Sequence, residues 1–329
     1  MDILVIGCGV SGLTTGIRLL EAGHRVTIWA RDMPGSRPLP QPPAVTSEVA
    51  AAVWYPYKAY PQERVNAWGA AAYRVFRELA AQGSPEEHGV VMREVVEALP
   101  QPAPDPWWVE AVRDTFRHAR AGELPAGYID GYIFAAPVID MSIYLGYLQR
   151  RFMDGGGTIS EHTIASLDEA FAANPIVVNC TGLGAREVVG DKELYPSRGQ
   201  VVRIRPRGFH RVVMDDYGPN KVAYIVPRVH DIVLGGVDDE HNESVTPDES
   251  VTAGILARCG SLVPEMANVQ PDDILAVVCG LRPARSTVRL EREEVAPGRI
   301  AIHNYGHGGA GVTLSWGCAD EVVALVSQS

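Results

Sequence analysis

A glycine-rich turn close to the start of the chain constrains the fold more than any other feature of the sequence. Residues 2–6 are an apolar strand candidate, residues 13–22 have the spacing of a helix, and residues 25–30 form a second strand candidate. In such a strand–turn–helix context, the first glycine of GxGxxG makes the turn and the second lets the backbone approach a pyrophosphate. The third glycine allows the helix to pack closely on the strand. The sequence therefore predicts a doubly wound α/β domain that binds a dinucleotide. The turn reads Gly7-Cys8-Gly9-Val10-Ser11-Gly12.

The end of the second strand leaves the identity of the dinucleotide open. An acidic residue usually meets the ribose 2′-hydroxyl there, but this strand ends Ala30-Arg31-Asp32. Arg31 could accommodate the phosphate of NADP, and either Arg31 or Asp32 could serve the adenosine half of FAD. This position alone is compatible with NAD, NADP and FAD.

The composition limits the partners that we expect. The chain of 329 residues has 46% hydrophobic and 21% charged residues, enough to bury the core of one compact protomer. Its formal net charge of −11 creates a negative field that repels phosphate backbones, so we expect no nucleic-acid partner. The uncharged run 3–17 is too short for a membrane span and is interrupted by glycines, so we expect no membrane association. The five cysteines lack metal-ligand spacing, which favours reduced thiols, no bound metal and a cytoplasmic location.

Later segments predict a second domain. Residues 62–82 space their apolar side chains as one face of a helix, and short strand candidates follow further along the chain, at 176–179, 199–205, 222–227, 232–234 and 276–279. The simplest arrangement is a substrate domain, built on a mixed β-sheet, that is interleaved with the nucleotide domain. We place the nucleotide domain at 1–53, 140–195 and 276–329, and the substrate domain at 54–139 and 196–275.

The segment 303–313 indicates a flavin. Four glycines within the six residues 306–311 bring bare backbone against a flat ligand, and a helix candidate follows that runs through Val326. The N-terminus of that helix points at whatever the loop holds. Reduced flavin can carry negative charge at its N1 and C2 carbonyl edge, and oriented backbone donors would stabilise that charge.

Several motifs resemble, in order and spacing, those of the D-amino acid oxidase and D-aspartate oxidase family of FAD-dependent oxidoreductases. With the N-terminal glycine turn, the resemblance spans essentially the whole chain. It implies a Rossmann-type domain that holds FAD non-covalently, and a substrate pocket over the flavin face formed with the second domain. The motifs are Trp54-Tyr55-Pro56-Tyr57, Asn179-Cys180-Thr181-Gly182, Gly280-Leu281-Arg282-Pro283, Leu290-Glu291-Arg292-Glu293 and the segment His303 to Thr313.

The resemblance implies an oxidase that transfers a hydride from the α-carbon of a D-amino acid to flavin N5. The products would be a 2-oxo acid, ammonia and H2O2, with O2 and water consumed. Arg282 would hold the substrate carboxylate with a bidentate guanidinium fork, and Tyr224 would add a phenolic hydrogen bond. The carbonyl of Gly309 would meet the substrate amine. Catalysis would then depend on positioning and electrostatics, without a dedicated side-chain base. The resemblance also suggests a homodimer.

The same resemblance assigns the cofactor contacts. Three of the positions depart from the usual pattern of the family: Arg31 and Asp32 stand in reversed order, and Ala52 stands where glycine is frequent. The implied FAD-binding residues are Gly7, Cys8, Gly9, Val10, Ser11, Gly12, Arg31, Asp32, Thr46, Ser47, Ala51, Ala52, Val53, Ile164, Arg282, Gly308, Gly309, Gly311, Val312 and Thr313.

The preferred substrate side chain is less clear from the sequence. An acidic run at 238–240 disfavours D-aspartate and D-glutamate if it faces the pocket, so we expect neutral D-amino acids, with basic ones as a further option. Tyr217, in a stretch shorter than the active-site lid of animal relatives, is either a second substrate-clamping tyrosine or a turn residue. The alternatives are a glycine or sarcosine type of amine oxidase, a D-aspartate oxidase, a non-catalytic flavin-binding protein and an NADP-dependent reductase.

Overall fold

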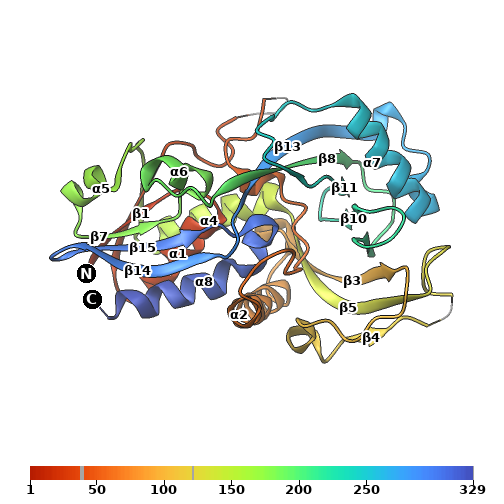
Figure 1. Ribbon diagram of the computed structural model, residues 1–329, viewed down its shortest axis with the longest axis horizontal. Helices are drawn as coiled ribbons and strands as arrows, with labels where there is room; N and C mark the ends of the chain where they lie inside the picture. The colour runs from red at the N-terminus through yellow and green to blue at the C-terminus, as the bar shows by residue number, and fades with distance from the viewer. Residues whose placement is uncertain (38–40, 121, 329) are drawn as a thin grey trace.

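Two β-sheets lie next to each other along the length of the molecule, and each carries its own helices (Figure 1). The computed structural model describes residues 1–37, 41–120 and 122–328. Both sheets are assembled from segments that are far apart in the chain, as an interleaved arrangement requires.

The first sheet is the one that the glycine turn predicts. Its strand order is β14-β15-β7-β1-β2-β6, and every neighbouring pair is parallel except β14 with β15. β1 and β7 are buried at nearly every position, the pattern of a parallel sheet that is covered on both faces. The predicted doubly wound α/β domain is therefore confirmed. The strands are β1 (Asp2–Ile6), β2 (Arg25–Ala30), β6 (Thr158–Glu161), β7 (Ile176–Asn179), β14 (Arg289–Ala296) and β15 (Arg299–Tyr305).

A group of helices packs beside this sheet. α1 contacts α8 and α4, and α2 contacts α8. The helical stretch Gly308–Val326, most of which is α8, is long and apolar enough to cross a membrane by length and composition. Most of it is buried inside the protein, and this burial accounts for its apolar character. The helices of the chain are α1 (Val10–Glu21), α2 (Gln62–Ala80), α3 (Pro85–His88), α4 (Met141–Asp154), α5 (Leu167–Ala173), α6 (Ala185–Val188), α7 (Glu249–Leu262) and α8 (Gly311–Val326).

The second sheet is mixed, as predicted. Its order is β12-β8-β11-β10-β9-β3-β5-β4, with β13 paired to β8; only β3 and β9 run parallel to each other. Helix α7 packs against β8, β10 and β11. The strands are β3 (Val90–Leu99), β4 (Arg117–His118), β5 (Asp130–Ile139), β8 (Tyr195–Ile204), β9 (Val212–Asp215), β10 (Ala223–Pro227), β11 (Ile232–Gly235), β12 (Asp239–Glu240) and β13 (Ile274–Ala284).

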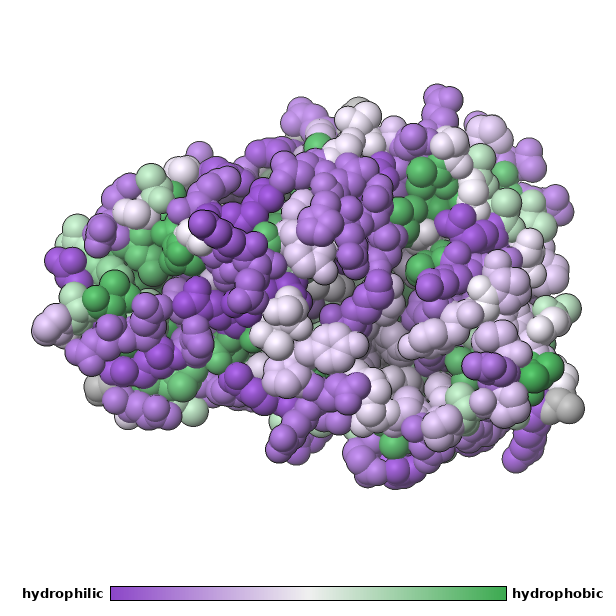
Figure 2. Space-filling model, viewed as in Figure 1, coloured by the Kyte–Doolittle hydropathy of each residue, from purple (hydrophilic) through white to green (hydrophobic). Residues whose placement is uncertain are grey.

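Strand β13 connects the two halves. It pairs along its length with β8 in the second sheet, so residues 276–284 belong to that sheet by hydrogen bonding, although we placed them in the nucleotide domain. Its far end contacts the 3₁₀ turns η1 (Thr46–Val49) and η6 (Gly308–Ala310), which belong to the predicted cofactor site. The side chains of β13 can therefore reach a ligand held between the halves. On the outer surface, hydrophilic residues cover most of the face shown in Figure 2, with apolar residues in smaller patches.

Candidate active site

One cavity of about 570 Å³ runs between the two sheets, a volume typical of small-molecule sites. Its wall contains every residue that the sequence assigns to substrate or cofactor except Gly12. The wall also contains Asp238 of the acidic run and residues with no predicted role, among them Tyr55, Tyr57, His162 and Asp216. The predicted residues in the wall are Gly7, Cys8, Gly9, Val10, Ser11, Arg31, Asp32, Thr46, Ser47, Ala51, Ala52, Val53, Ile164, Tyr224, Arg282, Gly308, Gly309, Gly311, Val312 and Thr313.

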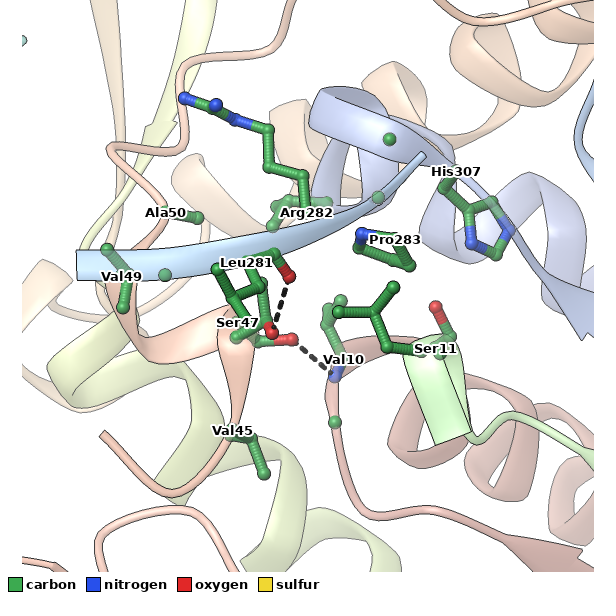
Figure 3. A pocket seen from close by; sticks show the side chains of 18 of the residues that line it. Val10, Ser11, Val45, Ser47, Val49, Ala50, Leu281, Arg282, Pro283 and His307 are labelled. Atoms are coloured by element: carbon green, nitrogen blue, oxygen red, sulfur yellow. Dashed lines mark hydrogen bonds between the residues drawn. The ribbon is translucent and has the colours of Figure 1, made fainter. Parts of the chain in front are cut away.

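The N-terminus of α1 forms one end of the cavity. Gly7 has φ = 109°, which favours glycine, and a Cβ on Gly12 would lie 1.9 Å from the Gly7 carbonyl oxygen. Gly12 thus acts by permitting the close approach of helix and strand, outside the cavity wall. Gly9 offers no side chain to cap the helix, and the first turn contains no acidic residue. The Val10 N–H donates to Ser47 Oγ at 3.1 Å, which ties η1 to this turn (Figure 3). The neighbouring backbone donors and the positive helix end suit an anionic group.

The end of β2 supplies polar side chains beside this turn. Asp32 accepts from Arg31 at 2.7 Å and from Arg37 at 2.5 Å, and its side chain is 14% exposed. His162 stacks on Trp29, with ring centroids 4.1 Å apart, and lines the cavity close to Ile164 in sequence. His162 lies in no sequence motif, because its contact with Trp29 depends on the pairing of β2 with β6.

The glycine-rich loop before α8 forms the middle of the cavity. Burial lowers the pKa of His307 to about 4, and its Nε2 atom lies 3.0 Å from Asn304 Oδ1, so the neutral ring anchors the loop to β15. Thr313 Oγ1 donates to the Tyr55 carbonyl at 3.0 Å, which ties α8 to the segment after η1. Thr46 Oγ1 bonds the Leu281 carbonyl of β13 at 3.0 Å. These bonds fix the three segments that would surround a flat ligand.

Two thiols face this part of the cavity. Burial raises the pKa of Cys8 to about 11 and that of Cys180 to about 12. Both groups are therefore protonated at neutral pH, and protonated thiols are weak nucleophiles. Toward a bound cofactor, the two thiols would act as small, uncharged, apolar side chains.

Arg282 lies near the end of β13. Its Nη1 atom donates to the backbone carbonyls of Val237 at 2.9 Å and Arg198 at 3.4 Å. Neither bond uses Nε or Nη2, which together form the side-on edge of the guanidinium fork. Figure 3 shows the side chain leaving β13 on the side opposite Ser47. A carboxylate in the cavity can bind that edge with two parallel hydrogen bonds.

The ring of Tyr224 fits beside this arginine because the residues that face the ring, at positions 235 and 236, are glycines. It pairs with Gly235 across β10 and β11, and a Cβ on Gly235 would lie 2.0 Å from Cζ of the tyrosine ring. A Cβ on Gly236 would lie 2.4 Å from its Cε1. The ring therefore lies against bare backbone. Burial raises the pKa of Tyr224, and the positive charge of Arg282 opposes this shift. The hydroxyl remains protonated and can donate to the same carboxylate.

A group of side chains that the sequence did not predict surrounds Arg282. Tyr57 donates to Asp238 Oδ2 at 3.0 Å, Lys58 forms an ion pair with the same carboxylate, and Ser197 donates to its Oδ1 at 2.5 Å. Arg282 Nη1 lies 3.9 Å from Asp238. In the acidic run 238–240, therefore, only the first residue, Asp238, faces the cavity, and the other two are exposed to solvent.

Other polar residues flank the same end. A Cβ on Gly309 would lie 3.0 Å from the Tyr57 ring and 3.6 Å from Arg282 Cδ, which places this backbone next to both. Tyr55 donates to the buried Glu97 at 2.7 Å. Tyr217 is 64% exposed and is not part of the cavity wall, but its hydroxyl interacts with that of Tyr55, which does line the cavity.

The comparisons with known proteins agree with this geometry. A family model described as FAD dependent oxidoreductase matches residues 2–325. A "D-amino-acid oxidase" of Rubrobacter xylanophilus is 47% identical over 99% of this chain and 96% of that protein. Another from Dictyostelium discoideum is 40% identical over 100% of this chain and 92% of that protein. A solved glycine oxidase from Geobacillus kaustophilus has the same fold, with a TM-score of 0.77 at 18% identity, covering 100% of this chain and 95% of that one. The chain belongs to the FAD-dependent oxidoreductase family.

Proposed function

We propose that the chain oxidises D-amino acids with FAD and O2, giving 2-oxo acids, ammonia and H2O2. The observation that carries the proposal is the pairing of Arg282 with Tyr224 at one end of a cavity whose other end is the glycine turn before α1. The backbone bonds of Arg282 use Nη1 alone, and its guanidinium interacts with the Tyr224 hydroxyl. The relatives at 40–47% identity that are named D-amino-acid oxidase support it.

The residues present fit FAD. The pyrophosphate would lie at the N-terminus of α1, where backbone donors and bare glycine allow close approach. Asp32 and Arg31 would serve the adenosine half, and the loop 308–313 with η1 would hold the ring. When bound, FAD supplies an acceptor for the hydride and returns the electrons to oxygen.

The side chains of the second sheet would bind and orient the substrate. Arg282 would take the α-carboxylate through Nε and Nη2, and Tyr224 would donate to it. The Gly309 backbone lies next to Arg282, so its carbonyl can accept from the amine of the same molecule. Holding carboxylate and amine at fixed points leaves one orientation for the α-hydrogen, and this is the main contribution of the protein to the rate.

The test is anaerobic mixing of the flavin-containing protein with D-alanine, L-alanine, D-aspartate and sarcosine, followed by flavin absorbance. We expect D-alanine to bleach the flavin and L-alanine to leave it oxidised, with H2O2 released once air is admitted. Bleaching by sarcosine without D-alanine would favour a sarcosine type of amine oxidase. A preparation without flavin would exclude the proposed function.

Substrate range, assembly and location are further parts of the proposal. Neutral D-amino acids are expected as substrates, because the cavity wall includes apolar residues such as Val201 and Met214. We also propose a cytoplasmic homodimer, without nucleic acid or membrane as partner. The five cysteines are free and buried, which suits a reducing compartment. Sedimentation would separate a 35.6 kDa monomer from a dimer, and cell fractionation would test the location.

A further inference from the structure

Two carboxylates, Asp238 and Asp216, lie in the cavity wall close to the substrate-binding residues. Asp238 is fully engaged by the protein. It receives hydrogen bonds from Tyr57 and Ser197, and it forms an ion pair with Lys58. Burial works to raise its pKa, but the bonds from Lys58 and Ser197 outweigh burial and lower it. Asp238 therefore contributes to the structure of the wall.

Asp216 is placed toward the cavity by strand geometry. It follows β9, in which successive side chains alternate between faces, and both Met214 and Asp216 line the cavity. The intervening Asp215 points the other way and organises the turn. Its carboxylate accepts from the backbone N–H groups of residues 217, 218 and 220 and from the Tyr128 hydroxyl. The backbone that carries Asp216 is thus held firmly.

The carboxylate of Asp216 has no such partners. Within residues 1–37, 41–120 and 122–328, no hydrogen bond or short ion pair to it is found. Burial raises its pKa to about 6, with the negative charge of Asp215 adding to the shift and Lys58 opposing it. Burial is the main cause of the raised pKa of Tyr57 and of Tyr224, and the negative charge of Asp216 adds to both shifts, as a carboxylate near the two phenols would.

We propose that Asp216 determines side-chain specificity, and that its carboxylate binds the ammonium or guanidinium group of a cationic D-amino acid side chain. The inference rests on the proposed D-amino acid oxidase function and adds cationic side chains to the neutral ones expected there. With the α-carboxylate on Arg282, the side chain would supply the donor that Asp216 lacks. The same charge repels acidic side chains, which would favour D-glutamine over D-glutamate.

The test compares substrates that differ in charge and little in shape. D-ornithine and D-norleucine have side chains of equal heavy-atom number that end in an ammonium and a methyl group; D-glutamate and D-glutamine differ in one carboxylate. We would measure kcat/KM for each at pH 8, where Asp216 is ionised, in wild type, Asp216→Asn, Asp216→Glu and Glu240→Gln. Glu240 is the matched control, because it is a carboxylate near Lys58 whose side chain is 49% exposed, and it lies outside the cavity wall.

We expect Asp216→Asn to lower the ornithine-to-norleucine ratio about tenfold and to raise the glutamate-to-glutamine ratio by a similar factor. Asp216→Glu should retain most of the preference, and Glu240→Gln should change either ratio less than about twofold. Flavin absorbance and thermal melting would confirm that each variant is folded.

Two outcomes would overturn the proposal. Unchanged ratios in Asp216→Asn would show that its carboxylate does not meet the substrate side chain. An equal change in Glu240→Gln would show a general surface field. If wild type oxidises none of the four substrates and not D-alanine either, the proposed function itself fails, which is a separate result.

Discussion

The two ends of the cavity differ in the groups that line them: backbone atoms at one end and long side chains at the other. At the end near α1, the turn 7–12 presents backbone and small side chains from one short, contiguous motif. The end at β13 consists of long, ionisable side chains from separate segments, including Tyr57, Asp216, Tyr224 and Arg282. A site made of backbone is specified by local sequence, because each glycine is required where it stands. A site made of side chains depends on strand pairing.

The largest effect is expected at the backbone-built end. A Cβ on Gly12 would meet the Gly7 carbonyl oxygen at 1.9 Å, and backbone cannot rotate away as a side chain can. We expect Gly12→Ala to destabilise the protein by about 3 kcal/mol or more and to abolish FAD binding. Flavin content and the melting temperature measure both.

Gly146→Ala is the matched control for this variant. Gly146 also lies inside a helix, but its nearest neighbour would be the mobile end of Arg150 at 3.4 Å. Because alanine has a higher helix propensity than glycine, this variant should gain up to about 1 kcal/mol. Equal losses in the two variants would mean that crowding at Gly12 is not the cause.

At the side-chain-built end, Arg282→Lys should lower kcat/KM for D-alanine about a hundredfold or more. Lysine keeps the positive charge and loses the side-on pair of donors, so the carboxylate is held less firmly and in more orientations. Flavin absorbance should be retained. If kcat/KM falls less than tenfold, charge alone holds the substrate and the fork is not required.

These differences explain what the sequence could predict. The glycine turn, the parallel sheet and the loop 306–311 could be predicted because their signals are local. Arg282 and Tyr224 were found only through a family resemblance. Asp216 and Tyr57 were assigned no role, since neither lies next to a motif glycine. Asp216 reaches the wall through the pairing of β9, and Tyr57 reaches it from the loop before α2. The alternation of Met214 and Asp216 along a strand was the one available signal.

The buried carboxyl of Glu97, which Tyr55 contacts, allows the side-chain-built end to be tested through the pH dependence of the unfolding free energy. Glu97 is 1% exposed, and burial raises its pKa from 4.5 to about 8, partly opposed by the bond from Tyr55. The folded chain keeps this proton where the unfolded chain loses it, so stability falls as the pH rises from about 4.5 to about 8. Glu97→Gln has no proton to lose there. Its unfolding free energy should therefore exceed that of wild type by an amount that grows by about 2–4 kcal/mol across this window.

Denaturant unfolding at pH 5, 7 and 9 with saturating FAD measures this difference. Glu94→Gln, an exposed position on the same strand, is the control and should follow the wild-type curve in parallel. Parallel curves for Glu97→Gln as well would mean that the carboxyl is already ionised at neutral pH.

The charge of Asp216 should also appear in a pH profile. Burial is the main cause that raises its pKa to about 6; the charges of Asp215 and Asp238 add to the shift, and Lys58 and Lys221 oppose it. The ornithine-to-norleucine ratio of kcat/KM should therefore rise by up to about tenfold between pH 5 and 7.5, because the carboxylate ionises while the side-chain amine stays protonated. The profile of Asp216→Asn should be flat. A flat wild-type profile would place the titration elsewhere.

The smallest effect is expected at the backbone-built end, at Ala52, a position where the family resemblance leads us to expect glycine. Ala52 has φ = 57°, a left-handed conformation that costs a residue with a Cβ about 1 kcal/mol. Ala52→Gly removes that strain but increases the freedom of the unfolded chain, so we expect a net rise in melting temperature of about 1–2 °C. Ala51→Gly is the control. Its backbone lies outside the left-handed region, so the same change should lower the melting temperature. If both variants lose stability, the Ala52 methyl contributes more through packing in the cavity wall than its backbone strain costs, and glycine is not required for the conformation.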